Sequence, residues 1–279
     1  MSKLADLHIH TTCSDSTQTP EEVILHAKEV GLNCISIADH DTVDGIDPAI
    51  AAGKEHGIEV IPAIELSTEI NKKDVHMLGY LMDYKNPEFV ETIHKIQHSR
   101  IGRMHDMIAK LNELGVDNIT FDEVSEMAGT KSLGRPHLAH FLVEKGWVKN
   151  KQEAFNKYLA EGQAACVPKY KISPFEGIEL IAKAGGISVL AHPKFSGVDE
   201  HIPAFVEAGL GGLEIYYPNT PPELVKFYEG IVAKHGMVAT GGSDAHGDNK
   251  KHTYIGRMNI PYDLVEKLKE YHKAKFNTV

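Results

Sequence analysis

The stretch Ala5-Asp6-Leu7-His8-Ile9-His10-Thr11-Thr12-Cys13-Ser14-Asp15 indicates an apolar strand that runs into a loop. Side chains alternate between the two faces of a strand, so His8 and His10 point the same way. Asp15 adds a carboxylate five residues after His10. Two imidazoles on one face can chelate a metal. Taken alone, the stretch is equally consistent with two half-buried structural histidines and a turn aspartate.

Strand and helix patterns alternate along much of the chain. After the opening strand, short apolar runs predict buried strands at residues 34–38, 59–64, 75–81, 186–191, 212–216 and 237–240. Helical patterns separate most of them, beginning with a capping box at Thr19-Pro20-Glu21-Glu22. This α/β alternation predicts a distorted seven-stranded (β/α) barrel of the TIM type. An open doubly wound sheet is the alternative.

The alternation stops in the middle of the chain, where only helical patterns occur. We therefore expect a barrel domain in two pieces, residues 1–99 and 169–279, that carries the functional site. Residues 100–168 form a helical insertion that caps this site. Residues 100–170 contain ten Lys/Arg and nine Asp/Glu, a net charge of +1. The rest of the chain therefore has a net charge of -11, since the whole chain has -10. This asymmetry fits an insertion that meets an anion.

Composition limits the classes of protein to which the chain can belong. The 279 residues are 42% hydrophobic and 24% charged, as in ordinary globular proteins. A net charge of -10 argues against binding to long duplex nucleic acid, which needs a basic face. The sequence shows no signal peptide and no apolar run long enough for a membrane. Three widely spaced cysteines, Cys13, Cys34 and Cys166, predict free thiols and a cytoplasmic protein.

Metal-binding residue types gather where the predicted strands end, which is where (β/α) barrels place their chemistry. One of the histidines, His76, lies instead within its predicted strand. The candidates are six histidines and three carboxylates: His8, His10, Asp15, His40, Glu65, His76, His192, Asp244 and His246. Histidines with purely structural roles would not be expected to gather on one rim.

Nine ligands suit two or three divalent ions, because one ion takes only three to six protein ligands. The mixed nitrogen and oxygen donors fit Mn²⁺ best, with Fe²⁺ or Zn²⁺ as alternatives. Glu65 is the carboxylate best placed to bridge two of these ions. Clustered ions would make the site net positive and attract a phosphate. A metal-bound hydroxide held by these ligands is then the expected nucleophile.

The motifs as a set resemble the PHP (polymerase and histidinol phosphatase) family. They are Asp6-Leu7-His8-Ile9-His10, Ala38-Asp39-His40-Asp41-Thr42, Glu65, His76, Ala191-His192-Pro193 and Ser243-Asp244-Ala245-His246-Gly247. The insertion, with Gly134-Arg135-Pro136-His137, resembles the branch that contains nucleoside 3',5'-bisphosphate phosphatases and RNase AM, a 5'-to-3' exoribonuclease for short RNAs. The resemblance implies a distorted seven-stranded barrel with a trinuclear metal site.

The resemblance also implies how the ligands divide among the metals. His8, His10, Glu65 and Asp244 would hold one ion, Asp15, His40 and His246 a second, and Glu65, His76 and His192 a third. Asp39 and Asp41 are expected to orient metal-bound histidines or to cap loops. Glu214 and Tyr216 end a predicted strand, where they either line the site or serve packing.

Arg135 is the main candidate for binding a substrate phosphate. It opens a helix next to Pro136, where anions bind readily, and its guanidinium can hold a phosphate by two hydrogen bonds. A surface ion pair is the alternative. His137, which could instead cap the helix, and Lys169 are weaker candidates for the same role.

The function expected from the resemblance is removal of the 3'-phosphate from nucleoside 3',5'-bisphosphates, converting pAp to AMP and phosphate. Attack on short 5'-phosphorylated RNA in the 5'-to-3' direction is a related expectation. One alternative is a phosphatase of the histidinol phosphate type, against which the insertion speaks. Another is a non-catalytic metal-binding module, against which the intact ligand set speaks.

Overall fold

A computed structural model describes residues 3–129, 133–167, 172–250, 252–258 and 260–276. The chain divides into two compact units, one of residues 1–91 and 171–279 and one of residues 92–170. We call them the barrel unit and the helical unit and describe each by itself. None of the helices in the described parts of the chain is long and apolar enough to cross a membrane.

A single sheet of eight strands forms the centre of the barrel unit. Its order is β7-β6-β5-β4-β3-β2-β1-β8. The strands are β1 (Leu4–Ile9), β2 (Cys34–Ile37), β3 (Glu59–Ile70), β4 (Lys73–Tyr80), β5 (Ile187–Leu190), β6 (Gly212–Tyr216), β7 (Val238–Gly241) and β8 (Ile260–Pro261). The seven predicted strands are all present. The eighth was missed because its two residues carry no detectable pattern.

Two of the strand pairings differ from the predicted parallel arrangement. β4 runs antiparallel to both β3 and β5, whereas β1–β3 and β5–β7 are parallel series. β3 and β4 form a hairpin whose loop residues, Asn71 and Lys72, both have positive φ, as a type I′ turn requires. The hairpin carries β3 to Ile70, so the prediction that this strand ends at Glu65 was wrong.

The chain just after β7, an edge strand of the sheet, lies beside the end of β1, near the opposite edge. The His10 amide donates to the Ala245 carbonyl at 3.0 Å, and the Asp244 amide donates to the His8 carbonyl at 2.8 Å. Ile9 and Ala245 form a parallel bridge at the same place. The barrel is therefore nearly closed, which confirms the barrel prediction over the open doubly wound alternative.

The first strand is buried on both faces. Its odd-numbered residues, Ala5, Leu7 and Ile9, enter apolar clusters. Alternation therefore directs Asp6, His8 and His10 to the opposite face, where all three are fully buried. The apolar packing on one side of β1 fixes the register that brings its histidines together on the other.

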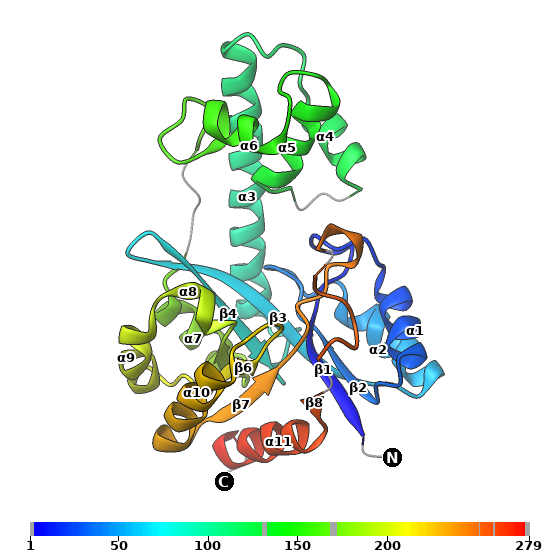
Figure 1. Cartoon of the computed structure of the whole chain (residues 1–279), viewed down its shortest axis with the longest axis vertical. Helices are drawn as coiled ribbons and strands as arrows, with labels where there is room; N and C mark the ends of the chain where they lie inside the picture. Colours follow the sequence, from blue (N-terminus) through cyan, green and yellow to red (C-terminus); the bar gives the residue numbers. More distant parts are fainter. Residues whose placement is uncertain (1–2, 130–132, 168–171, 251, 259, 277–279) are drawn as a thin grey trace. The chain divides into compact units, whose positions relative to one another are not determined.

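Helices surround the sheet (Figure 1). Those of the barrel unit are α1 (Pro20–Glu29), α2 (Ile46–His56), α7 (Pro174–Lys183), α8 (Pro193–Ser196), α9 (Ile202–Glu207), α10 (Pro222–His235) and α11 (Asp263–Phe276). The predicted capping box at α1 is confirmed, since Thr19 and Glu22 satisfy each other's amides. α10 packs against β6 and α11 against β7, so these two helices cover the sheet at those strands.

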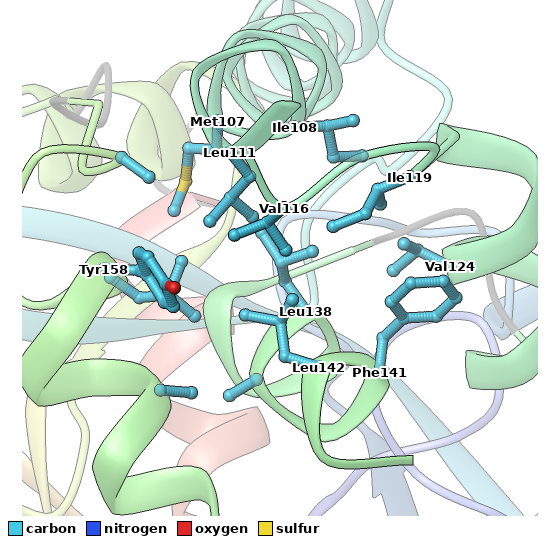
Figure 2. Close-up of a cluster of buried hydrophobic side chains, with 14 of the residues drawn as sticks. Met107, Ile108, Leu111, Val116, Ile119, Val124, Leu138, Phe141, Leu142 and Tyr158 are labelled. Carbon is cyan, nitrogen blue, oxygen red and sulfur yellow. The ribbon is translucent and has the colours of Figure 1, made fainter. Parts of the chain in front are cut away.

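The helical unit has its own apolar core. It contains most of α3 (Pro87–Glu113), which begins in the barrel unit, together with α4 (Phe121–Ala128), α5 (Arg135–Glu144), α6 (Lys151–Ala154) and a π-helical turn, η1 (Phe155–Leu159). Figure 2 shows side chains from these elements converging, among them Leu111, Leu138, Leu142 and Tyr158. The unit thus buries enough apolar surface to hold its helices together.

We predict that Leu142→Ala lowers the free energy of unfolding by about 2–5 kcal/mol, because Leu142 is fully buried and its truncation leaves a cavity. Urea denaturation followed by circular dichroism measures this. Leu114→Ala is the control: its side chain is 48% exposed, so we expect a change within about 0.5 kcal/mol. Equal effects of the two substitutions would contradict the assigned core.

Candidate metal centre

The Glu65 carboxylate lies at the centre of a cluster of histidines. It is 1% exposed and sits in the middle of β3. Five imidazole nitrogens lie within 3.3 Å of its two oxygens, from His8, His10, His40, His76 and His192. Four different strands or strand ends therefore deliver histidines to one carboxylate.

The backbone explains how Glu65 meets His40. The segment that follows β2 continues to pair with β3, with His40 bridged to Glu65. The Glu65 amide donates to the Asp39 carbonyl at 3.1 Å, and the Asp41 amide donates to the Glu65 carbonyl at 3.0 Å. His76 reaches the same carboxylate from within β4, at 2.9 Å from Glu65 Oε1. Mid-strand residues of the hairpin thus contribute alongside residues at strand ends.

Two further carboxylates complete the cluster. Asp244 Oδ1 lies 3.1 Å from His10 Nε2 and 3.4 Å from His246 Nδ1. Asp15 Oδ1 lies 3.3 Å from His246 Nε2, and Asp15 Oδ2 lies 3.9 Å from His40 Nε2. The loop after β1 therefore carries Asp15 back toward the segment after β7.

Three overlapping groups of donor atoms could each hold an ion, the atoms of each group lying within 4.8 Å of one another. The groups are His10, Asp15, His40 and His246; His8, His10, Glu65 and Asp244; and His40, Glu65 and His76. His192 is outside these groups but has its Nε2 3.0 Å from Glu65 Oε1. All nine residues named from the sequence thus lie in one cluster, while their division among ions stays a prediction.

The donor set fits divalent cations. Among the described residues, four buried atoms of the cluster, His40 Nδ1, Glu65 Oε2, His192 Nδ1 and His246 Nε2, have no hydrogen-bond partner. The Nε2 atoms of His8 and His10 face each other at 3.1 Å. Buried polar atoms are normally hydrogen-bonded, and lone pairs that converge without donors are what a bound cation satisfies.

Electrostatics keeps the three carboxylates of the cluster ionised. Burial would raise the pKa of Glu65, but the neighbouring histidines, led by His40, hold it well below its usual value. The pKa of Asp15 is likewise lowered despite burial, by its electrostatic interactions with His40, His246 and His10 together. The pKa of Asp244 is lowered despite burial by its hydrogen bond with His10. Ionised carboxylates are the form that binds metal.

Four of the histidines differ in how the cluster shifts their pKa. Burial opposes the charged form of His8 and His10, yet adjacent carboxylates raise the pKa of His8 well above its usual value and that of His10 to about 9. Burial lowers the pKa values of His40 and His246, with further repulsion from charged His10 at both. Metal binding requires neutral imidazoles, so His8 and His10 release protons when they become ligands.

Glu214 orients two of the candidate ligands. Its Oε1 lies 2.9 Å from His8 Nδ1, and its Oε2 accepts the His192 amide at 2.8 Å. Holding Nδ1 of His8 directs Nε2 toward Glu65. The sequence placed Glu214 at the end of the β6 strand but did not identify its partners, because the pairing spans 206 positions.

Two other contacts at Asp244 were missed from the sequence. The Tyr217 hydroxyl donates to Asp244 Oδ2 at 2.8 Å, and Lys250 Nζ lies 3.1 Å from the same oxygen. Both hold the second oxygen of Asp244 and leave Oδ1 facing the histidines. Neither residue belongs to a motif that identifies it before the fold is known.

Asp39 and Asp41 stabilise loops, the second of the two roles expected for them. Asp39 accepts hydrogen bonds from the Thr11 amide and hydroxyl, at 2.7 and 2.6 Å. Asp41 Oδ1 accepts the Ser67 amide at 2.7 Å. Each carboxylate ties the segment after β2 to a neighbouring strand or loop that carries ligands.

The backbone is strained or crowded at the cluster. His192 and Asp244 have positive φ, +28° and +52°, which side-chain-bearing residues rarely adopt. A Cβ on Gly242 would lie 2.4 Å from Cβ of His8, so this position accepts only glycine. Such features persist where the surrounding structure holds them and cluster at functional sites.

The predicted phosphate-binding residues lie apart from this cluster in the sequence. Arg135 begins α5, donates to the Leu159 carbonyl at 3.3 Å, and has its guanidinium carbon 6.0 Å from the centre of the Phe155 ring. His137 Nδ1 accepts the Gly134 amide at 3.0 Å, which is the capping role named as its alternative. Lys169 lies outside the described residues.

Comparison with known proteins adds three kinds of similarity. The PHP domain model matches residues 6–100. A 5'-3' exoribonuclease of Haemophilus influenzae is 36% identical over 69% of this chain and 70% of its own length. A 3',5'-nucleoside bisphosphate phosphatase of Chromobacterium violaceum is 28% identical over 90% of both chains. A solved structure assigned as a metal-dependent phosphoesterase, from Bifidobacterium adolescentis, superposes with a TM-score of 0.84 at 31% identity over 97% of both chains.

We predict that Glu214→Gln weakens Mn²⁺ binding about 10- to 100-fold, because His8 loses the carboxylate that fixes its ring. Titration calorimetry of the metal-free protein measures the affinity. Glu229→Gln is the matched control, since Glu229 lies on α10 and contacts the Tyr216 hydroxyl rather than a ligand. Unchanged affinity in Glu214→Gln would show that His8 needs no such support.

Proposed function

Because the chain belongs to the PHP family, we propose that it is a metal-dependent phosphoesterase that removes the 3'-phosphate from nucleoside 3',5'-bisphosphates. The observation that carries this proposal is the convergence of nine side chains of metal-binding types, with Glu65 at their centre. The names of the relatives, a bisphosphate phosphatase and exoribonucleases, support the class of substrate.

The reaction is hydrolysis of a phosphate ester. Water adds to phosphorus, the bond from phosphorus to the 3'-oxygen breaks, and that oxygen takes up a proton. Two or three divalent ions, Mn²⁺ by preference and otherwise Fe²⁺ or Zn²⁺, would supply activation of the water and neutralisation of phosphate charge. His8, His10, Asp15, His40, Glu65, His76, His192, Asp244 and His246 would hold them.

The residues around the ligands have supporting roles. Glu214 orients His8, and Tyr217 orients Asp244, so that ring nitrogens and carboxylate oxygens face a common space. Glu65, His8 and His10 are buried on one side of that space, whereas His40, His76 and His192 are partly exposed on the side open to a substrate. A preorganised site of this kind stabilises charge that develops during reaction without further rearrangement.

Short 5'-phosphorylated RNA, attacked in the 5'-to-3' direction, is a second proposed substrate. The similarity to the exoribonucleases of Haemophilus influenzae and Escherichia coli favours it. The chain carries a net charge of -10, which disfavours long nucleic acids more than short oligonucleotides.

We also propose a cytoplasmic location, since Cys13, Cys34 and Cys166 are free thiols.

Assays of phosphate release test these proposals. Metal-loaded protein should release phosphate from adenosine 3',5'-bisphosphate and mononucleotides from a short 5'-phosphorylated RNA, and a chelator should abolish both activities. Activity on histidinol phosphate without activity on the bisphosphate would overturn the proposed substrate. Absence of hydrolysis of every phosphate ester by the Mn²⁺-loaded protein would favour a non-catalytic metal-binding module.

We predict that Asp244→Asn lowers kcat by at least about 100-fold, because the substitution removes a charged donor while keeping its shape. Steady-state kinetics on adenosine 3',5'-bisphosphate measures this. Asp248→Asn is the control, since Asp248 is exposed four residues further along the chain and should retain activity. Full activity of Asp244→Asn would contradict the metal assignment.

For the helical unit, we propose that Arg135 binds a substrate phosphate and that residues 100–168 thereby take part in substrate capture. Arg135 opens a helix of ten residues whose N-terminus favours anions, and its guanidinium is only half-buried. His137 and Lys169 are proposed as weaker contributors to the same role.

We predict that Arg135→Ala raises KM for adenosine 3',5'-bisphosphate about 10- to 100-fold, the effect expected from losing charged hydrogen bonds, and changes kcat less. Lys149→Ala removes an equal charge from an exposed position of the same unit and should leave KM within about 2-fold of that of the unchanged protein. Equal KM values for the two variants would show that Arg135 serves only the structure of α5.

A further inference from the structure

A large aromatic side chain is exposed beside the metal-binding cluster. Phe195 lies on α8, the short helix that follows β5, and is 67% exposed. Among the large hydrophobic side chains of the described residues, this is the highest exposed fraction. Single exposed apolar side chains are common on protein surfaces, so it is the position of this ring, next to a candidate active site, that points to a ligand. A ligand bound there can cover the phenyl ring and remove its apolar surface from water.

The ring is held close to the cluster. The Phe195 amide donates to the His192 carbonyl at 3.0 Å, and the two ring centres are 6.2 Å apart. The Phe195 ring packs edge to face against Tyr217, with centres 5.5 Å apart. Since His192 contacts Glu65 and Tyr217 binds Asp244, the exposed ring is a single side chain away from two candidate ligands.

A lysine fixes the surroundings of the ring. Lys194 Nζ lies 4.6 Å from the centre of the Phe195 ring and 4.9 Å from that of Tyr217. It also donates to the Pro218 carbonyl at 2.6 Å, which ties the turn after β5 to the loop after β6. Phe195 and Tyr217 thus belong to a cluster of rings held by a cation, with one ring left open to solvent.

Nucleotide bases are the ligands that match such a ring. A base stacks on an exposed aromatic face, and one ribose separates it from the phosphate to be hydrolysed. We propose that Phe195 is the stacking surface for the base of the nucleotide substrate. This inference rests on the proposed function, and it assigns the base-binding part of that same site.

Stacking has a consequence for specificity. Every base has an aromatic face, so stacking tolerates all four bases, whereas hydrogen bonds to base edges discriminate among them. Within the part of the chain that the structure describes, Phe195 and Lys194 contact the His192 and Tyr217 rings and the Pro218 carbonyl, none of which is a group positioned to read a base edge. We therefore expect substrates that differ only in the base to be processed with similar efficiency.

Binding measurements test the inference without relying on turnover. AMP and ribose 5-phosphate, which lacks a base, are titrated into the Mn²⁺-loaded protein by calorimetry. We expect Phe195→Ala to weaken AMP binding about 5- to 150-fold and to leave ribose 5-phosphate binding unchanged. Phe195→Trp should retain AMP affinity. Phe227→Ala removes another exposed ring, on α10, and should retain it as well.

The outcomes separate this inference from the proposed function. Unchanged AMP affinity in Phe195→Ala, equal losses for AMP and ribose 5-phosphate, or no AMP binding by the unaltered protein would each overturn the stacking role. Phe195-dependent AMP binding in a protein that hydrolyses no bisphosphate would support the stacking role and refute the proposed function. Hydrolysis of the bisphosphate by the unaltered protein, together with unchanged AMP affinity in Phe195→Ala, would support the proposed function and refute the stacking role.

Discussion

The buried carboxylate of Glu65 is the constraint on which the rest of the barrel unit depends. Its charge lies among five imidazoles, and removing such a group from water is costly unless opposite charges or cations compensate it. The β3–β4 hairpin places Glu65 at mid-strand, and neighbouring strands supply the histidines. The antiparallel position of β4 between two parallel series of strands is therefore tied to the site, because it brings His76 to Glu65.

The surrounding structure holds this arrangement against its own electrostatic and backbone strain. Glu214 fixes His8, and Gly242 lets the chain after β7 pass directly against the same histidine. His192 adopts a positive φ, and its amide donates a hydrogen bond to Glu214. In the short helix that follows, the Phe195 side chain is exposed. Rigidity at the candidate ligands and an open ring beside them suit the proposed binding of a phosphate at the cluster and of a base on the ring.

Much of this could be predicted from the sequence. Apolar runs located seven strands, and a capping box located the start of α1, since these features depend on neighbouring residues. The nine candidate ligands were recognisable because each follows or lies within such a run. The continuation of β3 past Glu65, the two-residue β8, and the roles of Glu214, Tyr217 and Lys250 were not predictable, because each depends on a partner far along the chain.

The sequence by itself determined the alternation of strands and helices, the helical interruption and the set of candidate metal ligands. All of these follow from local patterns of polarity and from residue chemistry. Only the tertiary structure decided that β4 runs antiparallel, that the sheet nearly closes at Ile9 and Ala245, and that one carboxylate gathers five histidines. The physical reason is that strand pairing and the charge of a buried cluster are set by distances in space, which separation along the chain does not fix.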